Sequence, residues 1–278
     1  MKKRKTRRYL LILGFLGLAV LLLNAGPLST RARAVDCPAV ENSIDSDKDG
    51  FTDYQECYGI TMYDDSLFPG RATSGNYSRD QRLDPDTPDL FVILRPASPS
   101  NLPANPLELV SRSQAEGGLG VTVHVITDPS APADRMVSPD SPQKAVRITE
   151  DLDPVGIILG EANQGTPNGL DNAFIYTNHI IDFIDTTCAE GSSCIDAGTG
   201  YSGQALIDLY IKHVIAHEVG HMTMLAAEYN SRFGGYHYKA GSDVIMEQAE
   251  VFTIKKGVVT FYISQHYAEP SQVGLLLK

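Results

Sequence analysis

The sequence predicts an α/β fold in which a mixed sheet packs against one long helix, and two observations carry this prediction. Residues 90–94 and 121–126 are short apolar runs rich in β-branched side chains, as is typical of buried strands. Residues 204–228 contain no proline and repeat apolar or histidine side chains every three or four positions, the period of a packed helix. The chain of 278 residues is long enough for one sizeable domain and a small appendage.

A shorter helix is predicted between these two strands. Asn105 can cap it, Pro106 suits its first position and Gly117 suits its end, so that its body covers 107–116. The result is a strand–helix–strand unit. After a proline-rich surface loop, further strands are predicted at 145–149, 155–160 and 173–177.

Residues 1–34 have the pattern of an export signal. A basic start is followed by an apolar run over 10–23, and Ala32-Arg33-Ala34 fits a cleavage site with small residues. The mature chain would then begin at Val35. We therefore expect a secreted or extracytoplasmic protein that is free of the membrane after cleavage. An uncleaved anchor and a twin-arginine export route, suggested by 6–10, stay open.

The charge of the mature chain limits its partners. Eight of the 23 Lys and Arg residues precede Val35, whereas none of the 34 Asp and Glu residues do. This leaves 15 basic and 34 acidic residues, a formal charge of −19. So much negative charge repels nucleic acids and anionic membranes and favours cations or cationic partners. Nucleic acid is therefore not an expected partner.

Four cysteines in an exported chain predict two disulfides. Their spacing favours the pairs Cys37 with Cys57 and Cys188 with Cys194, and the two other pairings stay open. A zinc site made of these cysteines is disfavoured because the chain has no C-x-x-C pair.

The sequence His217-Glu218-Val219-Gly220-His221 lies within the long predicted helix. Residues four apart project from the same helix face, so both imidazoles can bind one metal ion. Glu218 is rotated by about 100° around the axis and can reach a metal-bound water without being a ligand. These are the groups by which proteins activate water on zinc, with Glu218 as the catalytic general base.

A catalytic zinc usually has three protein ligands, so one more is expected. His237 is the first candidate because it follows a glycine-rich turn that can lead the chain back to the helix. Glu250 and Glu247 are the alternatives. His213 lies on the same helix face, but about 12 Å from His221 along the axis, so we expect it to pack rather than to bind the ion.

Over 217–248 the chain resembles the metzincin clan of zinc peptidases, and a looser likeness extends over 89–278. The resemblance implies a two-lobed zincin-like fold with His237 as the third zinc ligand. It also implies that Met246 forms an apolar floor beneath the zinc in a tight turn. The chain departs from the metzincin pattern because 15 residues separate His221 from His237, which requires an insertion. A glutamate ligand would instead resemble the gluzincin clan.

Residues 45–56 match a twelve-residue calcium loop, with Gly50 at the sixth position, where the loop turns sharply. Phe51 would offer its backbone carbonyl. The segment resembles the calcium repeats of thrombospondin type 3 and dockerin-like modules, which implies a structural Ca²⁺. The side-chain ligands are expected to be Asp45, Asp47, Asp49, Asp53 and Glu56. A weaker acidic group that can bind a second ion consists of Asp84, Asp86 and Asp89.

The predicted organisation is a signal over 1–34, a small calcium-binding module over 35–88 and a catalytic domain over 89–278. The module lacks apolar periodicity, so we expect ions and a disulfide to hold it rather than a core. The expected function is that of a secreted zinc endopeptidase with a protein or peptide substrate. Two alternatives stay open: a calcium-stabilised surface or adhesion protein with a structural zinc, and a zinc hydrolase of non-peptide substrates.

Overall fold

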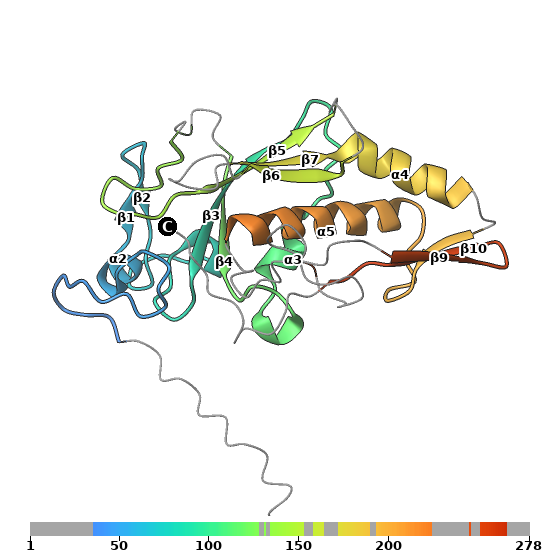
Figure 1. Cartoon of the computed structure of the whole chain (residues 1–278). Coiled ribbons are helices and arrows are strands. Elements are labelled where there is room, and N and C mark those ends of the chain that lie inside the picture. The colour runs from blue at the N-terminus through green and yellow to red at the C-terminus, as the bar shows by residue number, and fades with distance from the viewer. Residues whose placement is uncertain are drawn as a thin grey trace, which may run out of the picture. The chain divides into compact units, whose positions relative to one another are not determined.

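The computed structural model describes residues 36–127, 131, 134–152, 158–163, 172–189, 193–223, 245 and 251–265 (Figure 1). Its largest sheet has five strands: β3 (Asp89–Arg95), β4 (Thr122–Ile126), β5 (Val146–Asp151), β6 (Gly160–Asn163) and β7 (Asn172–Tyr176). Their order is β4-β3-β5-β7-β6, with β6 antiparallel to β7 and the other neighbours parallel. The α/β class and the parallel strand–helix–strand unit are thereby confirmed.

The longest helix, α5 (Gln204–Met222), runs along one face of this sheet and contacts β5, β6 and β7 (Figure 1). Two further helices, α4 (Thr177–Ala189) and α3 (Glu108–Ser111), pack on α5. The predicted 107–116 helix is thus split, because α3 is followed by the 3₁₀ turn η2 (Gln114–Glu116). Gly117 ends that turn in the left-handed conformation, as predicted.

The helix α4 was not expected, although it follows β7 directly. Its sequence is rich in isoleucine and threonine, and such β-branched residues are weak helix formers. Ile180 and Ile184 are buried in the same apolar cluster as α5. Tertiary packing of this face therefore outweighs the local preference.

The two faces of the sheet are covered by different parts of the chain. Along β3, Leu90 and Val92 belong to the cluster that contains α5, whereas Phe91 and Ile93 belong to a second cluster. Alternate residues of a strand point to opposite faces, so the second cluster lies on the face away from α5.

The N-terminal module supplies much of this second cluster. Its elements are α2 (Asp53–Tyr58), β1 (Ile60–Thr61), β2 (Leu67–Phe68) and η1 (Arg79–Gln81). Phe51, Ile60 and Leu83 are buried there, and the ring of Phe51 lies edge-on to Phe91 at 5.8 Å between centroids. The expectation that the module lacks a core is therefore wrong: its few apolar residues share one with the sheet.

A second sheet contains β8 (Ser193–Asp196), β9 (Val251–Lys255) and β10 (Val258–Tyr262) in the order β8-β10-β9. The disulfide Cys188–Cys194 joins the end of α4 to β8, and the disulfide Cys37–Cys57 ties the chain before the acidic loop to α2. Both predicted pairings are confirmed. Over the described ranges, no helix is long and apolar enough to cross a membrane. The predicted export signal, 1–34, lies outside the described residues.

Candidate functional site

The histidines of the predicted zinc motif lie near the end of α5, where their ring nitrogens converge. The Nδ1 atom of His217 donates a hydrogen bond to the carbonyl oxygen of Ile245 at 2.7 Å. With Nδ1 as the donor, Nε2 of His217 carries the lone pair that a metal ion requires. The Nε2 atoms of His217 and His221 lie 3.2 Å apart.

This separation fits a shared zinc ion. In a tetrahedral site with zinc–nitrogen bonds of 2.0–2.1 Å, two ligand nitrogens stand about 3.3–3.4 Å apart. The rings of His217 and His221 are inclined by 81°, so their edges rather than their faces meet. The pair therefore has the spacing and the donor type of two zinc ligands.

Glu218 belongs to α5, and its side chain lies against the edge strand β6. Its side chain is buried, with 6% of the residue exposed, and its carboxylate accepts a hydrogen bond from the backbone N–H of Ala162. Burial, and then repulsion by Glu161, raises the pKa of Glu218 to about 8, against which the Ala162 hydrogen bond acts. A buried carboxyl group with a strongly shifted pKa is a candidate for a functional group.

The close approach of β6 to α5 depends on Gly160. A Cβ atom at this position would meet Cγ1 of Val214 at 2.7 Å and Oε1 of Glu218 at 2.8 Å. No ordinary side chain fits there without a shift of the helix or the strand. Gly160 therefore brings the edge strand beside the carboxylate, a role that the sequence did not reveal.

Two more polar groups lie near Glu218 and were not predicted. The hydroxyl of Tyr176, on β7, donates a hydrogen bond to Oε2 of Glu161, on β6, at 3.2 Å. Burial and then the charge of Glu161 raise the pKa of Tyr176. A strand of four residues in a loop-rich stretch gives little sequence signal, which is why these neighbours were missed.

His213 packs inside the protein, as predicted. It is buried, and its Nδ1 donates a hydrogen bond to the carbonyl oxygen of Ser264 at 2.7 Å. Burial lowers the pKa of His213 to about 4, so the imidazole is neutral at ordinary pH.

The predicted third ligand and floor of the zinc site lie outside the described residues; these are His237, the alternatives Glu247 and Glu250, and Met246. One residue of this segment is described: Ile245 is fully buried, and its carbonyl holds His217. The chain immediately before Met246 therefore contacts the motif helix.

The predicted calcium loop closes on itself through Asp45 and Asp49. Asp45 accepts hydrogen bonds from the backbone N–H groups of Lys48, at 2.6 Å, and Gly50, at 3.2 Å. Asp49 accepts one from the N–H of Phe51 at 2.8 Å. Gly50 has a φ of 106°, which a residue with a side chain rarely adopts. The loop thus turns sharply at its sixth position, as expected.

Two groups of carboxylates gather at this loop. Oxygens of Asp45, Asp47 and Asp49 lie within 4.8 Å of one another, and so do oxygens of Asp49, Glu56 and Asp89. Burial and mutual repulsion raise the pKa of Glu56 to about 11, that of Asp49 to about 9 and that of Asp47 to about 7. Such a cluster is unfavourable as free carboxylates and is relieved by protons or by a bound cation.

Asp53 and the carbonyl of Phe51, also predicted as calcium ligands, stay predictions, and the structure shows the other contacts of these two residues. The carboxylate of Asp53 accepts hydrogen bonds from the N–H and hydroxyl groups of Ser46, at 2.8 and 2.9 Å. The ring of Phe51 is buried against the sheet, and its N–H group closes the loop.

The second predicted acidic group is divided in the structure. Asp84 and Asp86 both form ion pairs with Arg71, which offsets one of their two negative charges. Asp89 instead joins Asp49 and Glu56. The sequence could not indicate this because 33 positions separate Asp89 from the end of the loop at Glu56.

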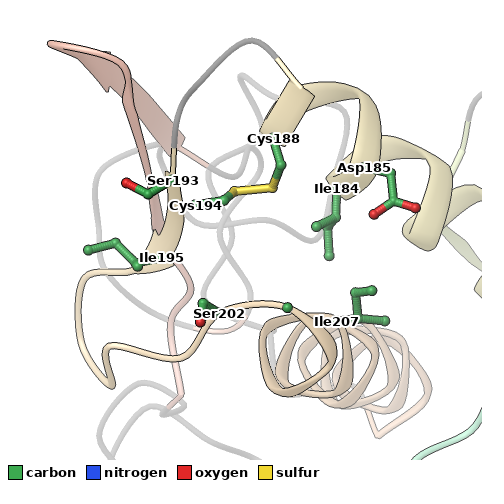
Figure 2. A pocket seen from close by; sticks show the side chains of 9 residues that line it. Ile184, Asp185, Cys188, Ser193, Cys194, Ile195, Ser202 and Ile207 are labelled. Carbon is green, nitrogen blue, oxygen red and sulfur yellow. A yellow bond between two sulfur atoms is a disulfide. The ribbon is translucent and has the colours of Figure 1, made fainter.

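A separate cavity of about 370 Å³ lies near the start of α5 and is partly walled by the Cys188–Cys194 disulfide (Figure 2). Ile184 and Ile207 line it from α4 and α5. Ile207 precedes His217 by ten residues, about 15 Å along the helix. This cavity is therefore distinct from the metal motif.

No protein-family model, curated protein or solved structure matches the chain.

Proposed function

We propose that the protein is an exported zinc-dependent endopeptidase. The observation that carries the proposal is the pair of Nε2 atoms, on His217 and His221, which lie 3.2 Å apart beside the buried carboxylate of Glu218. Two imidazoles that can hold the ion and a buried carboxylate on the same helix, which can act on the water, are the groups of a hydrolytic zinc site. The proposed fold is zincin-like, with His237 as the third ligand, Glu247 or Glu250 as alternatives and Met246 as the floor.

Each residue of the proposed zinc site has its own role in the reaction. The zinc, when bound, supplies a Lewis acid that lowers the pKa of a water molecule to about 7. His217 and His221 hold the ion, and the hydrogen bond to Ile245 keeps His217 in the tautomer that can do so. Glu218 accepts a proton from the attacking water and returns it to the amine that leaves.

The position of β6 at the edge of the sheet favours a peptide over other classes of substrate. In the five-stranded sheet, β7 pairs on both sides, with β5 and β6, whereas among the described residues β6 pairs on one side only. An extended peptide can add to such an edge through main-chain hydrogen bonds. Because Ala162 of this strand donates to Glu218, a peptide aligned along β6 would pass close to the proposed base.

The test compares the wild type with Glu218→Gln, which keeps the size of the side chain but cannot accept the proton. We expect one zinc per chain in both proteins and cleavage of a peptide library by the wild type alone, with a loss of roughly 10²-fold or more in the variant. Asp182→Asn is the matched control, because it removes a carboxylate at an exposed position on α4.

Two results would contradict the proposal: a wild type that binds no zinc, or a Glu218→Gln variant that cleaves as fast as the wild type and Asp182→Asn. Zinc in the wild type, with cleavage of ester or amide substrates but no peptides, would favour the non-peptide hydrolase. Zinc without any turnover would favour the adhesion protein.

The acidic loop is proposed to bind a structural Ca²⁺. Its donors are all oxygens, which Ca²⁺ and Mg²⁺ prefer and Zn²⁺ does not require. The two disulfides fit an oxidising, extracytoplasmic compartment. Export through the signal at 1–34 and secretion complete this proposal.

A further inference from the structure

We infer that the cation of the acidic loop is also bound by Asp89, so that one divalent ion joins the N-terminal module to the first strand of the main sheet. This inference rests on the proposed binding of Ca²⁺ by the acidic loop, but it concerns a site apart from the zinc motif and does not depend on the proposed peptidase activity.

Glu56 is the observation that points to a ligand. It is 0% exposed, and neither of its carboxylate oxygens has a hydrogen-bond partner. One oxygen lies within 4.8 Å of carboxylate oxygens of both Asp49 and Asp89. A buried carboxylate without partners is strongly unfavourable, and a bound cation would satisfy it.

The backbone of α2 holds Glu56 in this place. Thr52 caps the helix by accepting a hydrogen bond from the N–H of Gln55, whose side chain accepts one from the N–H of Thr52. This capping box fixes the first turn, and Glu56 follows immediately. The side chain is therefore positioned by the fold and does not enter the cluster by chance.

Asp89 is oriented towards the same point by the sheet. Its Oδ1 accepts a hydrogen bond from Nε2 of His124, on β4, at 2.8 Å, and its Oδ2 accepts one from the N–H of Asp84 at 3.0 Å. Each carboxylate oxygen has a second lone pair, so both remain able to bind a cation. His124 thus orients the carboxylate without occupying all of its acceptor sites.

Direct hydrogen bonds already bring the loop and the strand together. The N–H of Asp89 donates to Oδ2 of Asp49 at 2.5 Å. The buried amide of Gln143 donates to the carbonyl oxygens of both Asp49 and Asp89, at 2.9 and 2.8 Å. These hydrogen bonds do not involve an ion, so they hold the loop and the strand together by themselves and reduce the cost of ordering the ligands.

The charge and donor type select the class of ion. Asp49, Glu56 and Asp89 bring three negative charges into a buried volume. A dication neutralises most of this charge, and Ca²⁺ accepts six to eight oxygen ligands in a flexible geometry, whereas Mg²⁺ demands a near-ideal octahedron. Asp45 and Asp47 can complete the shell from the loop.

The test uses the full mature protein, stripped of metal and reloaded with one equivalent of zinc. Calcium binding is measured by titration calorimetry, and hydrogen exchange of β3 and β4 is followed with and without Ca²⁺. In the wild type we expect Ca²⁺ to slow exchange over 89–95 as well as over 45–56. Asp89→Asn should weaken binding roughly tenfold or more and remove the effect on β3.

The control is Asp140→Asn, which makes the same change of charge at an exposed position in the loop that contacts α2. It should bind Ca²⁺ as the wild type does. Wild-type affinity in Asp89→Asn would overturn the inference. If Asp89→Asn fails to fold, the wild type alone decides. Ca²⁺ that protects 45–56 but leaves exchange over 89–95 unchanged would overturn the role of Asp89. If Ca²⁺ does not bind at all, the proposed calcium loop fails together with the inference.

Discussion

Gly160 lies so close to Glu218 that a methyl group on Gly160 would meet Oε1 of Glu218 at 2.8 Å. The proposed base and the proposed substrate strand are therefore in direct packing contact. A change in the position of one must move the other.

The first prediction follows from this contact. Gly160→Ala should displace β6 or the Glu218 side chain, lowering the free energy of unfolding by about 1–3 kcal/mol. Peptide cleavage should fall while the zinc content remains, because the atoms nearest to the added methyl group belong to Val214 and Glu218 and not to His217 or His221. Chemical denaturation, metal analysis and a cleavage assay measure the three quantities.

Gly198→Ala is the control for Gly160→Ala. A Cβ at Gly198 would meet its nearest neighbour, Oδ2 of Asp196, at 3.4 Å, which is ordinary contact. Equal losses of activity in the two variants would contradict the packing argument.

His213 predicts how stability depends on pH. Its pKa is about 4 in the folded protein, against 6.5 for an unperturbed histidine. Below pH 6.5 the unfolded chain gains a proton that the folded chain refuses, so the free energy of unfolding falls as the pH drops towards 4. This histidine contributes up to about 3 kcal/mol of that loss.

His213→Gln isolates this contribution, because glutamine keeps a hydrogen-bond donor but does not titrate. Denaturant midpoints of the two proteins between pH 4 and 7 give the comparison. Their difference should narrow or reverse as the pH falls. A difference that is constant over this range would show that His213 is not the titrating group.

The two disulfides should contribute different amounts to the free energy of unfolding. Cys37 and Cys57 are 20 positions apart, whereas Cys188 and Cys194 are 6 apart. Because a longer closed loop restricts the unfolded chain more, replacing the first pair by serine should cost about 3 kcal/mol and the second about 2 kcal/mol. Thermal or denaturant unfolding under oxidising conditions measures both.

Only the first pair brackets the acidic loop, so its loss should also weaken Ca²⁺ binding. The second double variant serves as the control and should bind Ca²⁺ normally. If both double variants bind Ca²⁺ like the wild type, the Cys37–Cys57 bond does not contribute to the site.

Thr52→Ala tests whether the cap of α2 positions Glu56. Loss of an N-cap side chain costs about 1 kcal/mol, and here it should lower the Ca²⁺ affinity as well. Ser113→Ala is matched to it, because Ser113 forms a capping box with Glu116 at η2, away from the acidic loop. Calorimetric titration should separate the variants, and equal affinities would argue against a role for the cap.

The sequence predicted the parts of the fold that repeat a local pattern. The strands β3 and β4 and the helix α5 are periodic over many residues, so their apolar faces could be read directly. The disulfide pairs followed from spacing. The acidic loop and the His217-Glu218 motif were recognisable because their chemistry requires fixed intervals along the chain.

What could not be predicted depends on contacts between distant residues. The strand β6 is too short for a clear period, so neither Gly160 nor Glu161 could be placed beside Glu218. The position of Asp89 in the loop cluster results from β3 packing on the module. The helix α4 forms against its own local preference because α5 buries one of its faces.

The hydrogen bond from His217 to the backbone carbonyl of Ile245 determines which kinds of mutation disturb the orientation of this imidazole. A main-chain acceptor is present whatever side chain occupies the position, so substitutions at Ile245 cannot delete it. The carbonyl oxygen of Ser264, which accepts the hydrogen bond from His213, is likewise independent of the side chain at that position. The orientation of these two imidazoles is therefore insensitive to the identity of the residues that support them and sensitive to where the chain runs, so insertions and deletions near 245 or 264 are more damaging than point changes.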